Sequence, residues 1–549
     1  MLTDRDGDTN FTGGFVVRRK HPAQQIEDLK DRRILLGPSW EAEKHAAAIL
    51  ALKAAEVTIP AKIATKPTCA DAAVAVVEDE ADAAVISSYA YPLLEGCKTI
   101  DKGALRIIGS TPPVPFIQVF ANKVVTPEQK EEIAAALLAV RGDGGLLRQM
   151  ESKEGFVRVG SARQAAANGA WTDWRGPARD GCFPLPERLP SRARFLWRRP
   201  MTGAGMAGVA ATADRVIVVD KDETEKADIF RCLDAGTGDE WWTLEYPAAG
   251  DMDFSNAPRA NPLIRGELVY LLGAFGDLHC VRLDDGHVVW KRNIVKDFGA
   301  KVPAWGTSAA PLIAGDRLIV NPGARDASVV ALHRHTGAVL WKASGGPAAY
   351  SSFVVGRFGG VEQIIGYDAT SLHGWDPDTG RHLWQLVPDE TGDFNVPTPV
   401  VLNSRLLLTT ENNGTRIHDF DSDGRIRPKP SARSMVLAPD CSTPVVSDGI
   451  VFGCNRRLVC LDARDLQTRW VREEPIFDDY ANLVAGSGRL LITTNPGELV
   501  LIRATGARFD ERSRLRLFEK ADIWSHPAIV GDRLYVRTQA ETCCVLLGD

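Results

Sequence analysis

A pair of β-hairpin signals repeats along the last two-thirds of the chain, from about Arg194 onward. The first hairpin reads hydrophobic–Gly-Asp-Arg–hydrophobic, as in Pro311–Val320, and the second carries a tryptophan on its outgoing strand, as in Leu332–Trp341. Apolar runs on either side of Gly, Asp, Asn or Ser are typical of strands joined by tight turns. Repeats of this kind at a period of about 40–50 residues indicate a propeller or a solenoid.

The first signal occurs in eight copies that share two apolar strands around a short polar turn. These copies are Ala211–Val219, Pro262–Tyr270, Pro311–Val320, Ser351–Ile365, Pro399–Leu408, Pro444–Phe452, Asn482–Ile492 and Pro527–Val536. The second signal keeps its tryptophan in some copies (Trp242, Trp290, Trp341, Trp384, Trp470) and loses it in others (Asp421–Gly424, Ala504–Gly506). Its Asp/Thr-Gly turn predicts a glycine in the left-handed conformation. The tryptophan is expected on an outer strand, filling space between neighbouring blades.

The two ends of the repeat region complement each other. The last hairpin is followed only by the strand Cys543–Leu547, whereas Arg194–Arg199 is a tryptophan-bearing strand that precedes the first hairpin and has no hairpin of its own. We therefore predict that the early strand completes the last blade, which closes the ring and hides its edges. Counting on this basis predicts eight four-stranded blades from about Ser191 to Asp549.

Strands and helices alternate in the first part of the chain, up to about Gln164. We expect strands at Phe15–Arg18, Arg33–Gly37, Ile59–Ala64, Ala83–Ile86, Leu105–Ile108 and Phe116–Phe120. We expect helices at Glu41–Ala54, Ala70–Val77, Ser88–Leu94 and Thr126–Val140. Alternation of this kind predicts an α/β sandwich with a mostly parallel sheet.

The sequence thus predicts a multidomain protein, in which an α/β domain at residues 1–164 and an all-β propeller at residues 194–549 are joined by a linker at 165–193. The linker is rich in Ala, Gly, Pro and Arg. It contains Trp171–Gly181, whose two tryptophans and Gly-Pro turn suggest a segment pinned against the propeller.

Composition excludes several classes of function. The net charge is −6 and no Lys/Arg run stands out, so nucleic acid is not expected as a partner. No apolar stretch is long enough for a membrane span, and Met1–Asn10 lacks the apolar core of a signal peptide. The ten cysteines form no C-x-x-C pair. We expect them to be buried free thiols rather than metal ligands.

The first part resembles the phosphonate-type substrate-binding proteins of ABC transporters at Gly14–Pro22, Ile26–Gly37, Ala81–Tyr89 and Leu105–Phe116. The resemblance implies binding of a small anion at a helix N-terminus, where backbone N–H groups favour negative charge. The ligand-binding residues it implies are Ser39, Trp40, Ser87, Ser88 and Tyr89. The alternative is that Ser39 only caps its helix. Ser87 stands where an acidic residue is usual in that family, so an amine-bearing ligand is not expected.

Members of that family carry most of a first lobe ahead of the strand matched by Gly14–Arg18. Without an opposing lobe, a ligand cannot be buried on both sides. We therefore expect either that this part has become a docking module or that an upstream segment is missing, and we expect little ligand binding by this part alone. The resemblance implies a periplasmic or otherwise extracytoplasmic location.

The repeats and the string Trp171–Gly181 resemble the pyrroloquinoline-quinone (PQQ)-like propellers, which include the quinoprotein alcohol dehydrogenases and an outer-membrane assembly factor. The enzymes of that class use a vicinal disulfide and an acidic and amide set for Ca²⁺. Cys543-Cys544 is vicinal but sits in the last strand, where neighbours point to opposite faces, and Glu411–Asn413 reads as a polar turn. We expect no catalytic residues, no metal site, and neither PQQ nor Ca²⁺.

Loops that join an outer strand to the next inner strand should cluster on one face of a propeller. There they would present an aromatic rim suited to a protein or a glycan; its residues are Trp305, Tyr350, Phe394, Tyr480, Trp524 and His526. The alternative is that these rings pack between blades. The leading hypothesis is a non-catalytic binding or scaffold protein. A sensor of phosphate-like anions and a quinoprotein dehydrogenase are the alternatives.

Overall fold

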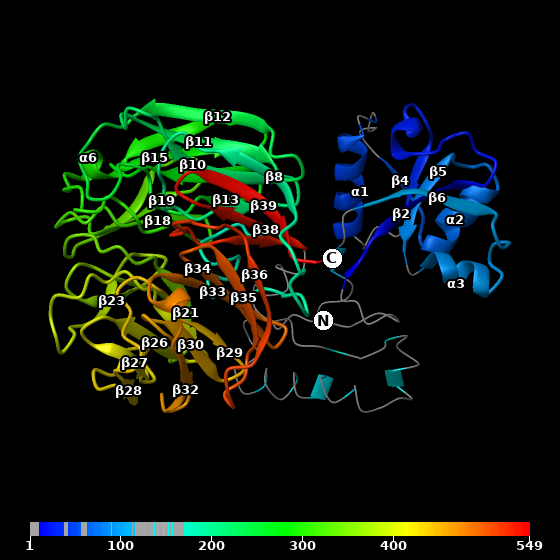
Figure 1. The fold of residues 1–549 in the computed structure, drawn as a ribbon. Coiled ribbons are helices and arrows are strands. Elements are labelled where there is room, and N and C mark those ends of the chain that lie inside the picture. Colours follow the sequence, from blue (N-terminus) through cyan, green and yellow to red (C-terminus); the bar gives the residue numbers. More distant parts are fainter. Residues whose placement is uncertain are drawn as a thin grey trace. The chain divides into compact units, whose positions relative to one another are not determined.

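The computed structural model describes residues 10–37, 42–55, 57, 63–88, 90–111, 114–115 and 170–548, together with isolated positions between 129 and 156. The chain divides into two compact units, Met1–Gly160 and Ser161–Asp549. The first unit is α/β and the second is all-β apart from short helical turns (Figure 1). Among the described residues, no helix has the length and apolar character needed to cross a bilayer.

The first unit is built on a five-stranded sheet with the order β4-β3-β5-β2-β6. Its elements are β2 (Gly13–Arg18), η1 (Ile26–Leu29), β3 (Ile34–Leu36), α1 (Ala42–Ala54), β4 (Ala64–Thr65), α2 (Cys69–Val77), β5 (Ala83–Ser87), α3 (Ala90–Gly96) and β6 (Leu105–Ser110). A separate pair joins β1 (Asn10–Phe11) to β7 (Val114–Pro115). On β2, Phe15 and Val17 pack toward α1, and Val16 packs toward α2 on the opposite face.

The expectation of a mostly parallel sheet is wrong for this unit. Pairs β3–β4 and β3–β5 are parallel, whereas β2 is antiparallel to both β5 and β6. Strand β2 is joined to β3 by a short connection through η1 and has no crossover helix, so it enters the sheet in the reverse direction. The predicted strand Phe116–Phe120 lies outside the described residues, as do most of the predicted helix Thr126–Val140 and most of the predicted strand Ile59–Ala64.

The second unit is a ring of eight four-stranded antiparallel sheets (Figure 1). Blades 1 to 4 are β9–β12 (Ala210–Ala211, Arg215–Lys221, Ala227–Asp234, Glu240–Pro247), β13–β16 (Leu263–Arg265, Leu268–Leu272, Asp277–Arg282, Val288–Asn293), β17–β20 (Leu312–Ala314, Arg317–Val320, Val329–His333, Val339–Ala343) and β21–β24 (Val354–Phe358, Val361–Tyr367, Leu372–Trp375, His382–Leu386). Helix α6 (Ile294–Phe298) follows blade 2.

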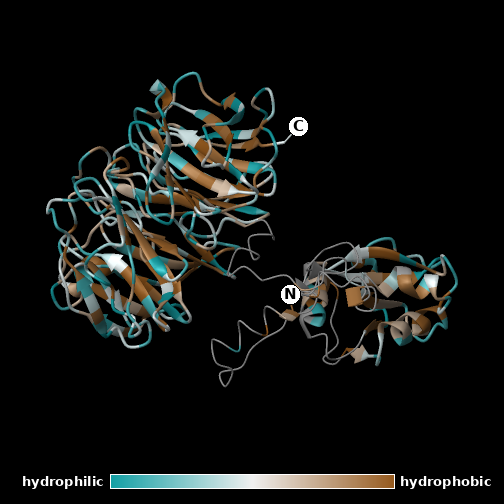
Figure 2. Ribbon diagram, turned by 90° about the horizontal axis from the view of Figure 1, so that it is seen from below, coloured by the Kyte–Doolittle hydropathy of each residue, from teal (hydrophilic) through white to brown (hydrophobic). Residues whose placement is uncertain are grey.

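Blades 5 to 7 are β25–β28 (Val400–Leu402, Arg405–Thr410, Gly414–His418, Ala432–Ser434), β29–β32 (Val445–Ser447, Ile450–Cys454, Leu458–Asp462, Thr468–Arg472) and β33–β36 (Ala481–Gly486, Arg489–Thr494, Glu498–Arg503, Glu511–Arg516). The turn η4 (Pro475–Phe477) follows blade 6. Hydrophobic residues concentrate in the strands, and the connecting loops carry more of the hydrophilic ones (Figure 2).

Blade 8 combines the two ends of the repeat region. It contains β37 (Ala528–Val530), β38 (Arg533–Arg537), β39 (Glu541–Leu546) and, as its outer strand, β8 (Phe195–Pro200). In this pair Trp197 lies opposite Cys544, and Phe195 lies opposite Val545. The prediction of eight blades, closed by the early tryptophan strand, is confirmed.

Each outer-strand tryptophan lies opposite a small residue on the third strand of its own blade. The six pairs are Trp197–Cys544, Trp242–Cys232, Trp290–Cys280, Trp341–Ala331, Trp384–Gly374 and Trp470–Cys460. The two blades without this tryptophan carry Ile417 and Leu501 at the corresponding third-strand position. A large ring and a small partner therefore fill the volume that an aliphatic side chain fills in the other blades.

Five of these tryptophans also join their blade to the next one. The indole Nε1–H of Trp197 donates to the carbonyl oxygen of Ala235 at 3.1 Å, and that of Trp242 donates to Leu283 at 2.8 Å. Trp290, Trp341 and Trp470 make equivalent bonds to Arg334, Pro377 and Thr505. The turn glycine of the following blade packs on the ring: a Cβ at Gly238, whose φ is 74°, would lie 2.6 Å from Trp197.

Replacement of Gly238 by alanine should therefore destabilise the propeller in two ways. Gly266→Ala is a matched control, because Gly266 also has a positive φ (61°) but has no atom within 4 Å of the added Cβ. We expect the control to cost about 1 kcal/mol for the left-handed backbone and Gly238→Ala to cost a further 1–3 kcal/mol, roughly, for overpacking. Urea unfolding of the propeller transition measures the difference. Equal costs would contradict the packing role of Gly238.

Candidate functional site

The segment Trp171–Phe183 lies on the axis of the propeller. Trp171 and Ala211 on β9 exchange two backbone hydrogen bonds of 2.7 and 2.8 Å. The carbonyl oxygen of Thr172 accepts from the N–H of Ile264 on β13 at 2.8 Å, and the N–H of Phe183 donates to Ala485 on β33 at 2.8 Å. Strands β9, β13 and β33 are the innermost strands of blades 1, 2 and 7, so the segment occupies the centre of the ring.

Two buried arginines fix the same segment to further blades. Arg179 forms an ion pair with Asp173 at 2.7 Å and donates to the carbonyl oxygen of Pro311, ahead of blade 3, at 2.8 Å. Arg175 donates to the carbonyl oxygen of Pro444, ahead of blade 6, at 2.7 Å. Burial raises the pKa of the Asp173 carboxyl to about 6, and Arg179 acts in the opposite direction. Burial also lowers the pKa of Arg175 to about 10.

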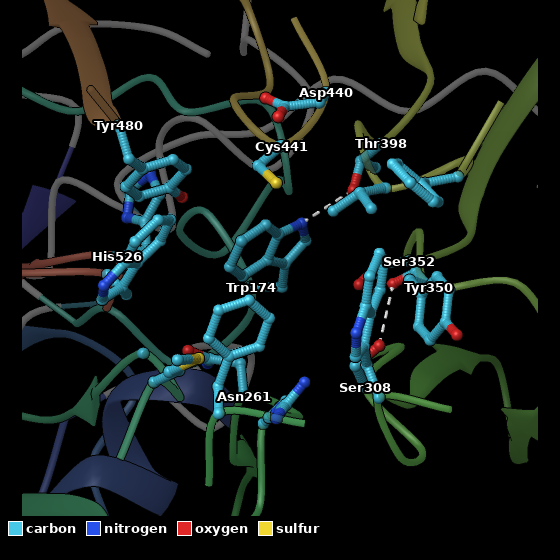
Figure 3. A pocket seen from close by; sticks show the side chains of 18 residues that line it. Trp174, Asn261, Ser308, Tyr350, Ser352, Thr398, Asp440, Cys441, Tyr480 and His526 are labelled. Carbon is cyan, nitrogen blue, oxygen red and sulfur yellow. Dashed lines mark hydrogen bonds between the residues drawn. The ribbon is translucent and has the colours of Figure 1, made fainter. Parts of the chain in front are cut away.

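A pocket of about 410 Å³ lies at the mouth of the ring beside this segment (Figure 3). Every one of the eight connections that lead from an outer strand to the next inner strand contributes at least one side chain or glycine to it. Trp174, from the axial segment, projects among them, and its indole N–H donates to the Thr398 hydroxyl at 3.0 Å. The pocket is therefore a product of the closed ring rather than of any single blade.

One lining position recurs in the same register in all eight repeats. It lies three residues before a position that is a proline in five repeats (Pro262, Pro311, Pro399, Pro444, Pro527). The strand pairing places Val209, Phe353 and Leu483 at the equivalent position in the other three repeats. The eight residues are Met206, Arg259, Ser308, Tyr350, Val396, Cys441, Tyr480 and Trp524. The backbone of each repeat thus aims this position at the axis, and the side chain at that position is free to vary.

Aromatic rings form two groups across the pocket. Trp305 lies 5.0 Å from Tyr350 and 4.8 Å from Phe394 between ring centroids. Tyr480 stacks on Trp524 at 5.3 Å. Large, rigid rings on two sides of a concavity offer apolar contact area with little loss of conformational entropy.

Three titratable groups beside the pocket have pKa values far from 7. His526 is 5% exposed, its Nδ1 lies 2.9 Å from the carbonyl oxygen of Pro527, and burial lowers its pKa to about 3. Burial, followed by the charge of Asp440, raises the pKa of the Cys441 thiol to about 12. Burial likewise raises the pKa of Tyr480. None of these groups is poised to exchange a proton at pH 7.

All six residues predicted for the interaction face, Trp305, Tyr350, Phe394, Tyr480, Trp524 and His526, line this pocket. The structure brings them together at one mouth of the ring, and their part in binding stays a prediction. Sequence reasoning missed Trp174, Arg259 and Asp440. The shared register described above would have pointed to Arg259, whereas Trp174 lies outside the repeats.

The predicted ligand site of the first unit is described only in part. Ser39, Trp40 and Tyr89 lie outside the described residues. Ser87 is buried at the end of β5, where its hydroxyl accepts from Nζ of the buried Lys44 at 3.0 Å. The hydroxyl of Ser88 instead accepts from the N–H of Thr12 at 3.2 Å. The two neighbouring serines are thus engaged with different partners.

The residues around the pocket do not fit a quinone with its calcium ion. Cys543 and Cys544 are fully buried thiols within blade 8 and do not line the pocket. One Glu411 oxygen accepts from the N–H of Phe394, and the Asn413 amide donates to Asp393 and Glu390. Asp440 is the one carboxylate among the lining residues. Within the described residues, no group of three or more His, Cys, Asp or Glu side chains could hold a metal ion.

These features define a two-domain protein in which an α/β substrate-binding-like domain precedes an eight-bladed propeller with an axial pocket. Residues 1–163 match the family described as "ABC transporter, phosphonate, periplasmic substrate-binding protein". Residues 190–302 and 225–470 match the family described as "Outer membrane protein assembly factor BamB", and together they span just over half of the chain. The chain therefore belongs to the PQQ-like repeat propellers of that family, with a phosphonate-type substrate-binding domain fused to it.

Solved structures share the fold at low sequence identity. A europium-containing methanol dehydrogenase is 11% identical with a TM-score of 0.54, over 69% of this chain and 98% of its own. Quinohemoprotein alcohol dehydrogenase from Comamonas testosteroni is 13% identical with a TM-score of 0.52, over 76% of this chain and 84% of its own. These likenesses concern the fold. No curated protein sequence matches the chain significantly.

The buried His526 makes the stability of the propeller depend on pH. Its folded pKa of about 3 lies below the ordinary histidine value of 6.5, so below pH 6.5 the unfolded chain binds a proton that the folded chain does not. Stability should therefore fall on acidification, by about 2–3 kcal/mol between pH 6.5 and 4.5 from this group. Thermal unfolding should show a smaller loss over that range for His526→Gln. His335→Gln, at an exposed position, should keep the wild-type profile, and parallel profiles for all three proteins would contradict the assignment.

Proposed function

We propose that the chain is a non-catalytic binding protein whose propeller holds its ligand, a segment of a protein or a glycan, in the axial pocket. The observation that carries this proposal is a single aromatic-lined concavity to which all eight inter-blade connections contribute. A few aromatic anchors in a concave, partly desolvated site are what recognition sites use for affinity.

The chemistry of the lining groups favours binding over turnover. A general acid or base works best with a pKa near the working pH, whereas His526 and Cys441 are shifted to about 3 and about 12. Among the described residues, the pocket lining offers one carboxylate, Asp440, whereas Ca²⁺ takes about six to eight oxygen ligands. We therefore propose that the protein acts without PQQ or Ca²⁺.

The matched families suggest the compartment and the kind of partner. One family is named for periplasmic substrate-binding proteins and the other for an outer-membrane protein assembly factor. We propose a periplasmic location and a protein partner in the first instance, with a glycan as the alternative that the aromatic lining also supports.

Retention of compounds by the full chain tests this function. The wild type and Trp305→Ala are incubated with an extract of small molecules, defined oligosaccharides and short peptides, and retained compounds are identified by mass spectrometry. We expect compounds that the wild type retains, that Trp305→Ala loses, and that are recovered unchanged. Conversion of a retained compound, or equal retention by the two proteins, would contradict the proposal. Val289→Ala, at an exposed outer-strand position, is the control.

A second candidate function is sensing of a small phosphate-like anion by the first unit. The observation that favours it is the buried ammonium of Lys44, which donates to Ser87 at the strand end where the family likeness places a ligand. Burial lowers the pKa of Lys44, which reflects the cost of holding this charge away from water. An ammonium group at this position is chemically suited to an anionic ligand.

Thermal shift measurements with phosphate, methylphosphonate and sulfate test the sensor function. A ligand at about 100 times its Kd stabilises the folded state by about 2.7 kcal/mol, so the transition of the first unit should move upward. Lys44→Met should abolish the shift. Lys53→Met, in the last turn of the same helix, should retain it. An unchanged transition with every anion would rule out the sensor function.

A further inference from the structure

The pocket carries two charged side chains, and they come from opposite sides of the ring. Arg259 belongs to the connection between β12 and β13, and Asp440 belongs to the connection between β28 and β29. These two connections are four blades apart in a closed ring of eight, so they face each other across the axis. In Figure 3, Asp440 lies across the pocket from Asn261, which comes from the same connection as Arg259.

The positive pole is a guanidinium with donors to spare. Nη2 of Arg259 donates to the backbone oxygens of Asp253 and Ser255, which fixes the side chain. Its Nε is buried and has no hydrogen-bond partner among the described residues. Arginine stays charged throughout the neutral range. Arg259 lines the pocket, where its guanidinium favours a ligand that supplies an anionic oxygen.

The negative pole is a carboxylate reinforced by its surroundings. Asp440 is exposed and lines the pocket. Glu411 and Asp479 lie close enough that, with Asp440, they add to the effect of burial in raising the pKa of Cys441. This side of the pocket therefore carries a negative potential, which favours a cationic group.

Apolar walls separate the two poles. Passing around the ring from Arg259 to Asp440, one side presents Trp305, Tyr350 and Phe394, and the other presents Tyr480 and Trp524. A ligand with a single charge would use one pole and leave the other uncompensated. Complementarity therefore favours a ligand that carries opposite charges at its two ends and an apolar body between them.

We propose that the axial pocket binds a short zwitterionic peptide with apolar side chains, with its α-ammonium group toward Asp440 and its α-carboxylate toward Arg259. The volume of about 410 Å³ lies at the lower end of pockets for small organic ligands, roughly 300–1,000 Å³, and suits a peptide of two or three residues. This inference rests on the proposed binding function and specifies its ligand.

Titration with the dipeptide Phe-Phe, followed by tryptophan fluorescence, tests the inference on the full chain. The probe has no tryptophan, so the signal comes from the protein, and three of its tryptophans, Trp174, Trp305 and Trp524, line the pocket. We expect saturable binding to the wild type. N-acetyl-Phe-Phe and Phe-Phe-amide should each bind about tenfold more weakly or worse, because each lacks one of the two charged hydrogen-bonding ends.

Variants assign each end of the peptide to its pole. Asp440→Asn should weaken binding of the free dipeptide about tenfold while leaving binding of the N-acetyl form unchanged. Arg259→Gln should weaken binding of the free dipeptide similarly while leaving binding of the amide unchanged. The matched controls are Asp448→Asn, in an exposed hairpin turn, and Arg357→Gln, at an exposed position of β21. Both should bind all three peptides like the wild type.

Three outcomes would overturn the inference. The first is equal affinity of the wild type for the free and blocked dipeptides. The second is an equal loss of affinity for N-acetyl-Phe-Phe and for Phe-Phe-amide in each of the two variants. The third is no saturable binding of Phe-Phe. In the last case, retention of another compound that depends on Trp305 would leave the proposed binding function standing, whereas its absence would remove both. The comparison of free and blocked dipeptides uses the wild type alone, so this part of the test does not depend on whether the variants fold.

Discussion

The contact between an outer-strand tryptophan and the turn of the next blade holds the propeller together. The indole N–H satisfies a turn carbonyl, and the turn glycine lets the backbone rest on the ring, as with Trp197, Ala235 and Gly238. Between blades 4 and 5, a glutamine bridges the tryptophan and the next turn. Gln363 accepts from the indole N–H of Trp384 and donates to the carbonyl oxygen of Gly424. Each hydrogen bond contributes only about 1 kcal/mol, but the contacts recur around the ring and set the spacing of its blades.

Ring closure turns this local contact into a site. With β8 in blade 8, eight connections converge at one mouth, and each delivers a residue at the same register. The axial segment then occupies the centre, where Arg175 and Arg179 bind backbone oxygens ahead of blades 6 and 3. Because a buried arginine that loses its acceptors is costly, the segment and the ring specify each other's positions. Trp174 is thereby set at the pocket although it belongs to no repeat.

The architecture could be predicted from the sequence because its signals are local. Turn residues, apolar strands and the tryptophan of the second hairpin recur along the sequence. The strand around Trp197 has no hairpin of its own, and this predicted that it completes the last blade. Six of the eight aromatic and histidine residues that line the pocket could be predicted by locating the connections between blades. The opposition of Arg259 and Asp440 could not be found in this way, since it depends on the number of blades and on two single side chains. The reversed direction of β2 was not predicted either, because an alternating strand–helix pattern does not give the direction of a strand that lacks a crossover helix.

The small residue opposite each tryptophan explains where many of the cysteines lie. Cys232, Cys280, Cys460 and Cys544 are spacers, interchangeable in the fold with the Ala331 and Gly374 of other blades, and each is fully buried in a different blade. A thiol reagent can reach such a sulfur only when its own blade opens. The protein therefore carries four built-in probes of local opening, in blades 1, 2, 6 and 8, and the order in which they are labelled would reveal where the closed ring first comes apart.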